Sequence, residues 1–581
     1  MFKIYKIYYR FLLHYKKQFF LFLIALVSFS IFQSIQPYFY KLFIDAIPSA
    51  NYQRLFQILA IYILVRILEL VSDVFTRWWG DCFLLPAARD ARLAVFKKIQ
   101  DLDFAFHLTK STGSLISAIK RGDLAFFSIH HVINIRISKI AISFLVILIF
   151  FSQIHWTVAL LMLLSFVVNL LVAYFLVKKN IKARKEFNRA EDKISAIIVD
   201  NLLNFETVKL FAKEDLELKR LKKQFENWLA RLWSYANSFR FIDVSVGGIG
   251  NLALFFILLF SLKEMAALRF TPGEYIMILG FISTFYPRFF ELIYEVRNLA
   301  KHQVDIQKYF SVLNKKTLVN DPAQPVEKAS VKGEIEFRNV SFSYPEGKQD
   351  ALNNINLHIR QGQSVAFVGH SGVGKTTIAK LLMRFYDPEQ GAIYLDGINI
   401  KDFTKDRLRS FMGVVPQDPI LFNNTIAFNI AYGADNVTQE ELIAATKMAN
   451  LNDFIETLPK KYETQVGERG VKLSGGQKQR LAIARMILSN PDIIIFDEAT
   501  SQLDSESEKK IQDAFWKAAK NKTTLIIAHR LSSIVKAEKI VVMEEGSIKE
   551  IGSHRDLLTR KDSLYSRFWR LQTIATAEFP S

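Results

Sequence analysis

A glycine-rich stretch at residues 369–376 has the residue types and spacing of a loop that binds phosphate groups. It reads Gly-His-Ser-Gly-Val-Gly-Lys-Thr, follows the apolar run 364–368 and precedes a helical pattern at 376–385. Its glycines allow backbone N–H groups to point at a β-phosphate beside a helix N-terminus. Lys375 would reach the β- and γ-phosphates, and the Thr376 hydroxyl would bind Mg²⁺. The pattern predicts a site for a nucleoside triphosphate.

The whole loop is a candidate contact surface for the nucleotide. We expect contacts from Gly369, His370, Ser371, Gly372, Val373, Gly374, Lys375, Thr376 and Thr377. His370 is at a variable position of the pattern, so the favoured alternative for its side chain is a solvent-facing residue without a role.

Two neighbouring carboxylates complete the predicted chemistry. Asp497 ends the apolar run 493–497, three isoleucines and a phenylalanine precede it, and Glu498 follows it. A buried strand that ends in Asp can hold Mg²⁺, and the next Glu can polarise an attacking water molecule. An Asp-Glu pair on the surface would be unremarkable, but the preceding apolar run argues against a surface position.

Residues 473–477 read Leu-Ser-Gly-Gly-Gln, another helix N-terminus that can offer N–H groups to phosphate. With the loop and the carboxylates in this order, residues 333–570 resemble the ATP-binding cassette (ABC) family, of which this motif is the signature. The resemblance implies that Ser474, Gly475, Gly476 and Gln477 bind the γ-phosphate of ATP held by a second subunit. Two cassettes would then close head to tail over two ATP molecules.

The same resemblance implies roles for four further residues. Tyr344 would stack on adenine, Gln417 would sense Mg²⁺ and the membrane domain, Asp504 would line the site, and His529 would contact the γ-phosphate. His529 also follows the apolar strand predicted at 524–528, a position that faces ligands in open α/β sheets. Residues 465–470 resemble a loop that exporters place against their membrane helices. Gln502 departs from the family pattern, and we expect it to tune coupling between subunits.

The N-terminal half has a different composition and predicts a membrane domain. Runs long enough to cross about 30 Å of hydrocarbon lie at 18–38, 55–75, 132–152, 156–177, 242–262 and 273–293. Glycines interrupt the start of the fifth run, but glycine is tolerated in membrane helices. We therefore expect six spans.

Basic residues orient these spans. Fifteen Lys and Arg lie between residues 178 and 240, and few lie in the connections at 42–53, 153–155 and 263–272. By the positive-inside rule, both termini and the ATPase domain are cytoplasmic. Residues 1–320 hold 41 Lys and Arg against 23 Asp and Glu, whereas residues 321–581 hold 34 against 33. The net charge of +19 thus reflects topology and anionic lipid rather than nucleic acid.

Two long connections, 76–131 and 178–241, are amphipathic and lack clusters of helix breakers. Each could form a helix away from the bilayer, a short crosspiece and a helix back, with arms of about 35–40 Å. The crosspieces are expected near 104–114 and 203–213. This arrangement resembles ABC exporters, in which such crosspieces dock on the cassettes. Inserted soluble domains are the alternative, and the absence of strand patterning opposes them.

The expected fold is a membrane domain of six α-helices with long cytoplasmic helical extensions, followed by an α/β P-loop ATPase domain. The resemblance adds an antiparallel β subdomain and a helical subdomain that carries the signature. The expected boundaries are 1–311 for the membrane domain, 312–332 for a linker, 333–571 for the cassette and 572–581 for a tail. The first apolar run lacks a cleavage site, so we expect no cleaved signal.

The spans contain a few ionisable residues that could contact the transported cargo. Arg66 and Glu69 are three residues apart, as are Arg288 and Glu291. One explanation is that each is an ion pair within its helix or a register contact between helices, and the other, equally weighted, is a cavity that meets an amphiphilic or anionic cargo. The single cysteine, Cys82, excludes an intramolecular disulfide. Apart from the predicted Mg²⁺ site, the sequence shows no metal-ligand spacing, and the adjacent His130 and His131 are interpreted as a pair at a helix end rather than as a metal site.

These features predict a half-transporter, an ATP-driven exporter that works with a second copy or a related half-transporter. The expected cofactors are ATP and Mg²⁺, and the expected location is a bacterial inner membrane. Some segments resemble exporters of heavy metals and glutathione conjugates, but lipid and multidrug exporters share much of the pattern, so the cargo stays open between lipid, drug and thiol conjugate. A regulatory or channel-like protein on the same scaffold is the alternative function. A nucleic-acid-handling ABC ATPase is opposed by the six spans.

Overall fold

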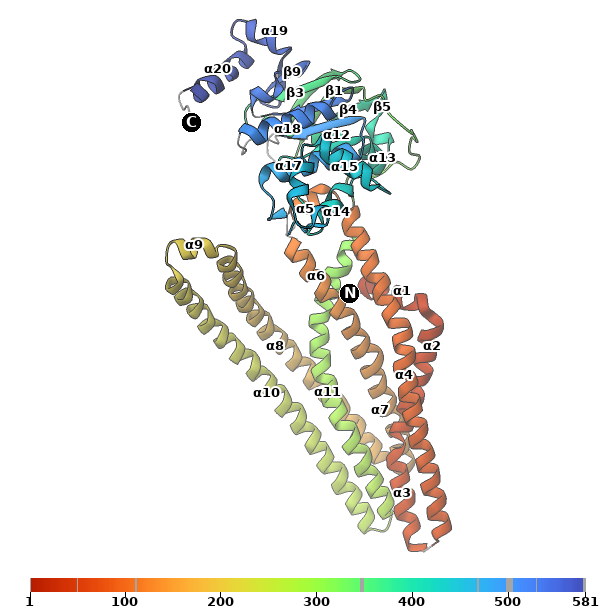
Figure 1. Cartoon of the computed structure of the whole chain (residues 1–581). Helices are drawn as coiled ribbons and strands as arrows, with labels where there is room; N and C mark the ends of the chain where they lie inside the picture. The colour runs from red at the N-terminus through yellow and green to blue at the C-terminus, as the bar shows by residue number, and fades with distance from the viewer. Residues whose placement is uncertain are drawn as a thin grey trace. The chain divides into compact units, whose positions relative to one another are not determined.

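The computed structural model describes residues 2–49, 51–109, 112–344, 350–467, 470–497, 505–528 and 530–577. The chain divides into two compact units (Figure 1). The first contains residues 1–102 and 110–315, and the second contains residues 103–109 and 316–581. The first unit is helical, and the second contains all the described strands.

Long helices build the first unit. They are α1 (Phe2–Leu12), α2 (Lys16–Ser34), α3 (Gln36–Ala46), α4 (Tyr52–Asp101), α6 (Thr112–Ile129), α7 (Ser138–Ile154), α8 (Trp156–Leu203), α10 (Glu214–Ala266) and α11 (Pro272–Ser311). By length and composition, four described segments could cross a membrane: Ile4–Ser49, Ala118–Ile154, Trp156–Leu202 and Glu214–Ala266. The predicted spans 55–75 and 273–293 lie within α4 and α11. Every predicted span is therefore helical.

Two of the predicted spans differ from a continuous α-helix. The span predicted at 18–38 is divided, because α2 ends at Ser34 and α3 begins at Gln36 with Pro37 in its first turn. Proline has no N–H to continue the hydrogen-bond ladder but is compatible with a first turn, so the helix restarts there. The span predicted at 132–152 begins in a π-helix, η3 (His130–Ile137), and continues as α7.

Both predicted crosspieces are present. The short helix α5 (Phe104–Thr109) follows α4, and α9 (Phe205–Leu210) joins α8 to α10 (Figure 1). Helix α8 has 48 residues, which corresponds to a length of about 72 Å. Since the hydrocarbon layer takes up about 30 Å of that length, about 40 Å remains for the extension. This agrees with the arms expected from the sequence.

Side chains between α7, α8, α10 and α11 form the core of the first unit. Phe144 stacks on Phe166 with ring centroids 4.2 Å apart, and Phe166 also contacts Phe289 of α11. Large apolar side chains that remain exposed are concentrated on the outer faces of α4, α8 and α10. Such faces are suited to lipid or to another copy of the chain.

Two sheets organise the second unit. The first has the order β2-β1-β4-β5, with β1 (Ile335–Ser343), β2 (Asp350–Ile359), β4 (Gln390–Leu395) and β5 (Ile398–Asn399), all antiparallel. The second has the order β10-β9-β3-β8-β7-β6, with β3 (Ser364–Val368), β6 (Met412–Val415), β7 (Ile493–Asp497), β8 (Thr523–Ile527), β9 (Lys539–Glu544) and β10 (Ser547–Gly552). Within the second sheet, β9, β3, β8, β7 and β6 are parallel to one another.

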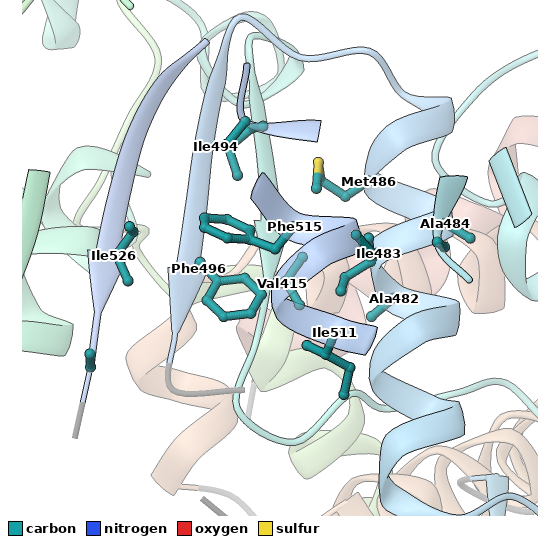
Figure 2. Close-up of a cluster of buried hydrophobic side chains, with 14 of the residues drawn as sticks. Val415, Ala482, Ile483, Ala484, Met486, Ile494, Phe496, Ile511, Phe515 and Ile526 are labelled. Atoms are coloured by element: carbon teal, nitrogen blue, oxygen red, sulfur yellow. The ribbon is translucent and has the colours of Figure 1, made fainter. Parts of the chain in front are cut away.

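Helices of the second unit cover the sheets and form a separate helical region. They are α12 (Lys375–Leu382), α13 (Lys405–Ser410), α14 (Ile426–Ala431), α15 (Gln439–Met448), α16 (Asn452–Thr457), α17 (Gly475–Leu488), α18 (Ser505–Ala518), α19 (His554–Thr559) and α20 (Leu564–Ala577). Figure 2 shows α17 and α18 packing on the second sheet through apolar side chains. Phe496 of β7 and Phe515 of α18 lie 4.1 Å apart by ring centroids. This packing fixes the end of β7, where Asp497 lies.

Candidate nucleotide-binding site

The predicted phosphate loop joins β3 to α12. All five residues of β3 are buried, so the loop starts from the centre of the sheet. Gly374 precedes α12 with φ of 99°, and a Cβ there would lie 2.4 Å from the Ala351 carbonyl oxygen. Gly369 has φ of 154°, and a Cβ there would lie 2.3 Å from the Met543 carbonyl oxygen. The glycines are therefore required by backbone geometry at both ends of the loop.

Lys375 is almost completely buried, with 4% of its surface exposed. Its Nζ donates to the carbonyl oxygens of Gly369 and His370, at 2.6 and 3.0 Å. The ammonium group is thus held inside the curve of the loop, next to the N-terminus of α12. Ser371, Gly372 and Thr376 are exposed, and Val373 is half-buried. The loop therefore combines an ammonium group held inside its curve with exposed serine and threonine residues, and phosphate binding can use both kinds of group.

Tyr344 and Thr377 lie on the buried side of the same helix. The Tyr344 hydroxyl and the Thr377 hydroxyl are 3.1 Å apart. The Tyr344 ring also packs edge-on against Tyr386, and the Lys380 ammonium lies 5.6 Å from its centre. Tyr344 therefore remains half-buried beside α12, in a position from which it can form one wall of a site. Thr377 supports Tyr344 rather than facing the loop opening.

Asp497 is aligned with the phosphate loop across three parallel strands. It is paired in register with Ile527 of β8, and Ile527 is paired with Phe367 of β3. Adjacent strands are about 4.8 Å apart, so the Asp497 Cα lies about 10 Å from the Cα of Phe367, two residues before the loop. Since parallel strands end at the same edge, the carboxylate and the loop share one edge of the sheet.

The electrostatics of Asp497 fit a cation ligand. Burial raises the pKa of its carboxyl group above the usual value, while the positive charges of Lys380 and Lys375 act against that rise. The structure gives this carboxylate no hydrogen bond or ion pair to another described residue. A half-buried carboxylate at the same sheet edge as an exposed Thr376 hydroxyl offers oxygen donors of the kind that Mg²⁺ prefers.

Gln417 lies two residues beyond β6, the strand that pairs with β7. Its side chain is exposed. Its backbone carbonyl accepts a hydrogen bond of 3.3 Å from Nε2 of Gln479, a residue of α17. The structure therefore connects the segment of Gln417 directly to the helix that carries the signature.

The signature motif forms the N-terminus of α17 through reciprocal capping. The Ser474 hydroxyl accepts the Gln477 N–H at 3.3 Å, and Gln477 Oε1 accepts the Ser474 N–H at 2.9 Å. Gly476 is buried, whereas Ser474 and Gly475 are exposed. Within the part of the chain that the structure describes, no hydrogen bond joins this helix end to the phosphate loop.

Three predicted site residues, Glu498, Asp504 and His529, lie outside the described residues, as does Gln502. The elements around them are described. Glu498 follows β7, Asp504 precedes α18, and His529 follows β8. Arg530, next to His529, forms an ion pair with Glu508 of α18.

The sequence did not indicate two contacts of α20. The exposed His370 ring meets the Phe568 ring edge-to-face, with centroids 4.9 Å apart and planes at 85°. Gln572, one turn further along α20, accepts the Leu531 N–H at 2.9 Å. His370 is therefore solvent-facing, as favoured above, but it packs against the C-terminal helix. No local pattern near residue 568 or 572 signals these contacts.

The first crosspiece belongs to the second unit. Phe104 of α5 stacks on Phe385 with centroids 4.6 Å apart and planes at 15°. The Asp103 carboxylate accepts the backbone N–H groups of Leu318 and Val319, at 2.5 and 3.1 Å. The segment that connects α4 to α6 thus docks beside the helix that begins with Lys375.

In the first unit the charged residues of the spans form one of the two possible intrahelical ion pairs. Arg66 and Glu69 are 2.6 Å apart, and Glu69 also accepts Gln36 Nε2 at 2.5 Å. The possible pair of Arg288 with Glu291 is not formed in the described structure. η3 packs beside α11, and Glu291 makes a contact between helices instead, 3.8 Å from Arg136, which also pairs with Glu295 at 3.1 Å.

The first unit also contains a cavity of about 780 Å³. It is lined by residues of α4, α6, η3, α7 and α11, with both charges and imidazoles among them: Asp73, Arg77, His130, His131, Lys139 and His302. The described residues contain no cluster of three or more His, Cys, Asp or Glu arranged to hold a metal ion. The charged and imidazole side chains in its lining give the cavity a polar character.

Comparison with known proteins gives consistent matches along the chain. A family model described as ABC transporter matches residues 352–501, and one described as ABC transporter transmembrane region matches residues 19–288. The structure of a bacterial Atm1-family ABC exporter with ATP bound is similar, with a TM-score of 0.85 and 31% identity. That similarity covers 96% of this chain and 98% of the other.

Two curated proteins are similar in sequence. The mitochondrial iron-sulfur clusters transporter ABCB7 of Oryzias latipes is 37% identical over 82% of this chain and 64% of its own length. Heavy metal tolerance factor 1 of Caenorhabditis elegans is 34% identical over 83% of this chain and 60% of its own length. The chain thus spans less than two thirds of the length of these relatives.

Proposed function

Because the chain belongs to the ABC transporters, with the membrane-embedded and ATPase parts of an Atm1-type exporter, we propose that it is an ATP-driven exporter that works as a dimer of two identical chains. The single observation that carries the proposal is the alignment of Asp497 with the phosphate loop. One chain thereby supplies most of an ATP site. The exposed, capped N-terminus of α17 supplies the complementary part to a second copy.

Each residue of the site has its own proposed role in ATP binding or hydrolysis. The loop N–H groups and Lys375 bind the β- and γ-phosphates, and Tyr344 lies against the adenine. Asp497 and Thr376 would hold Mg²⁺, with Gln417 beside them, and Mg²⁺ neutralises charge on the phosphates when it is bound. Glu498 orients the attacking water, His529 contacts the γ-phosphate, and Asp504 lines the interface between the two chains.

Mixed dimers test this division. Lys375→Ala disables the loop of one chain, and Ser474→Asp places a negative charge at the signature of the other. If sites are shared head to tail, one site of the mixed dimer contains both defects and the other contains none. ATP hydrolysis should then exceed that of either mutant homodimer. If each chain used its own Ser474, both sites would be disabled, and mixing would restore nothing.

The cargo that the first unit fits best is an anionic or zwitterionic solute with a soft donor, such as a thiol conjugate or its metal complex. The support is the cavity, whose Arg77 and Lys139 can pair with carboxylates and whose histidines can meet sulfur or bound metal. The printed names of the relatives, an iron-sulfur clusters transporter and a heavy metal tolerance factor, agree with this class. Lipids and uncharged drugs fit less well.

ATPase stimulation after reconstitution into bilayers tests the cargo. Thiol conjugates and metal–thiol complexes should stimulate hydrolysis, and Arg77→Gln should weaken the stimulation without changing the basal rate. Arg54→Gln, an exposed arginine near the start of α4, is the matched control. Stimulation by lipids or uncharged drugs alone would replace the proposed cargo class while leaving the ATPase assignment intact.

The proposed topology places the ATPase unit and both termini on the cytoplasmic side of a bacterial inner membrane. Cys82 is the only cysteine and is half-buried in α4, beyond the predicted span 55–75. In intact cells it should react with a membrane-permeant thiol reagent but not with an impermeant one. Labelling by the impermeant reagent would reverse the orientation.

A further inference from the structure

Helix α20 contacts two segments of the proposed ATP site from one of its faces. Phe568 meets the ring of His370 in the phosphate loop. Gln572 accepts the N–H of Leu531, the second residue after His529. Residues 568 and 572 are four positions apart, so they lie one above the other on the same face of the helix.

Contacts at its N-terminus and with the core fix the position of α20 in the second unit. The Glu550 carboxylate caps its N-terminus, accepting the Leu564 N–H at 2.8 Å and the Ser563 hydroxyl at 2.8 Å. Tyr565 is fully buried, and its hydroxyl lies 2.7 Å from Nδ1 of His554 in α19. Phe568 packs against the same core as β7 and α18. Phe568 and Gln572 therefore have defined positions relative to the sheet.

Each of the two contacts involves a residue that bonds to, or lies close in sequence to, a group proposed to bind phosphate. The carbonyl oxygen of His370 accepts a hydrogen bond from Nζ of Lys375, so the position of the His370 backbone determines where the ammonium group is held. The segment at Leu531 begins η8 (Leu531–Ile534), and its first N–H groups have no acceptor within that short helix. Gln572 supplies an acceptor from a distant part of the chain and so restrains the backbone just after His529.

We propose that Phe568 and Gln572 are positioning residues for ATP hydrolysis, and that α20 holds the phosphate loop and the segment after His529 in a common register. This inference rests on the proposed ATPase function. Phe568 acts on nucleotide binding through the loop, because it contacts His370. Gln572 acts on turnover through the backbone of Leu531, because His529 is expected to meet the γ-phosphate.

Substitutions of Gln572 test the turnover arm in the full-length, reconstituted protein. Gln572→Ala removes the acceptor, and we expect kcat to fall about tenfold with KM for ATP unchanged. Gln572→Glu keeps an acceptor oxygen and should restore most of the rate. Leu571→Ala, at an exposed neighbour on the same turn, is the control and should behave as wild type. Equal rates for Gln572→Ala and wild type would overturn this arm.

Phe568→Leu tests the binding arm, since leucine keeps the apolar contact with the core and removes the aromatic edge. KM for ATP should rise about threefold to tenfold, and His370→Ala should give the same rise without adding to it. Thermal unfolding distinguishes a positioning role from simple destabilisation, because the variants should melt close to wild type. Unchanged KM in a well-folded Phe568→Leu protein would refute this arm. A wild-type protein that does not hydrolyse ATP would instead refute the proposed function.

Discussion

Phe104 and Phe385 stack face to face, 4.6 Å apart, and this contact attaches the loop between two long membrane helices to the domain that carries the phosphate loop. Phe385 follows α12 by three residues, and α12 begins with Lys375. Tyr386, the next residue, touches both Phe104 and Tyr344. Phe385 and Tyr386 therefore connect α5 to α12 and to Tyr344 through ring contacts.

The stack predicts that Phe104→Ala uncouples transport from hydrolysis. Loss of the ring removes the apolar contact between α5 and Phe385 but leaves every proposed catalytic group in place. Basal ATP hydrolysis should persist, while cargo stimulation should fall strongly in reconstituted vesicles. Leu108→Ala, on an exposed position of α5, is the matched control. Full stimulation in the Phe104→Ala protein would show that α5 does not carry the coupling.

Glu498→Gln should preserve ATP binding and lower hydrolysis by about 10²- to 10⁴-fold, since general-base catalysis contributes factors of this size. The measurement is phosphate release from the purified, reconstituted protein, together with the ATP affinity. A near-normal rate would assign the base to another residue.

Lys375→Ala should weaken ATP binding itself, because the substitution removes the charge that the loop carbonyls hold next to the phosphates. Calorimetry with ATP and Mg²⁺ measures this. An unchanged affinity, in a protein that melts like wild type, would contradict the phosphate-loop assignment.

Asp497→Asn should stabilise the nucleotide-free protein near pH 8 while abolishing hydrolysis. Burial raises the pKa of Asp497 above its ordinary value of 3.8, so the folded state prefers the protonated form. That preference stabilises the fold fully below pH 3.8 and is lost as the pH rises through the raised pKa. The thermal advantage of the Asn variant should therefore shrink as the pH is lowered. A variant that is less stable than wild type at pH 8 would show that the charge is well solvated.

Ser474→Asp separates capping from phosphate binding. Aspartate is as good an N-cap as serine, so α17 and the melting temperature should be preserved. Its negative charge, however, would repel a γ-phosphate presented by the partner chain, and hydrolysis should fall below that of Ser474→Thr. Equal activity of the Asp and Thr variants would argue that the signature does not meet phosphate.

The Arg66–Glu69 pair predicts a structural outcome. Glu69 is 8% exposed and bonds both Arg66 and Gln36, so Glu69→Ala removes the acceptor of the half-buried Gln36 amide and of the Arg66 guanidinium, at a cost of about 1 kcal/mol. Arg66→Gln should cost less, because Arg66 is half exposed, and cargo stimulation should survive in both variants. Lost stimulation in a well-folded Arg66→Gln protein would instead place Arg66 in the cargo route.

The local geometry of the segments proposed to bind phosphate could be predicted from the sequence. Gly369, Gly374 and Lys375 act through local backbone geometry at a strand–helix junction, and Ser474 caps its own helix. Both kinds of structure depend on neighbours within a few positions. The two crosspieces were likewise predictable, since composition and length determine where a helical hairpin can turn.

Tertiary structure decided the relationships between distant segments. The pairing of Arg136 with Glu291 depends on how η3 packs beside α11, and the stacking of Phe104 on Phe385 depends on where α5 packs within the second unit. The contacts of Phe568 and Gln572 depend on where α20 packs. Hydrophobic periodicity shows which face of a helix is buried, but not which partner covers it. The partner is chosen by the shape of the whole core, because many apolar surfaces in one chain can satisfy the same burial requirement.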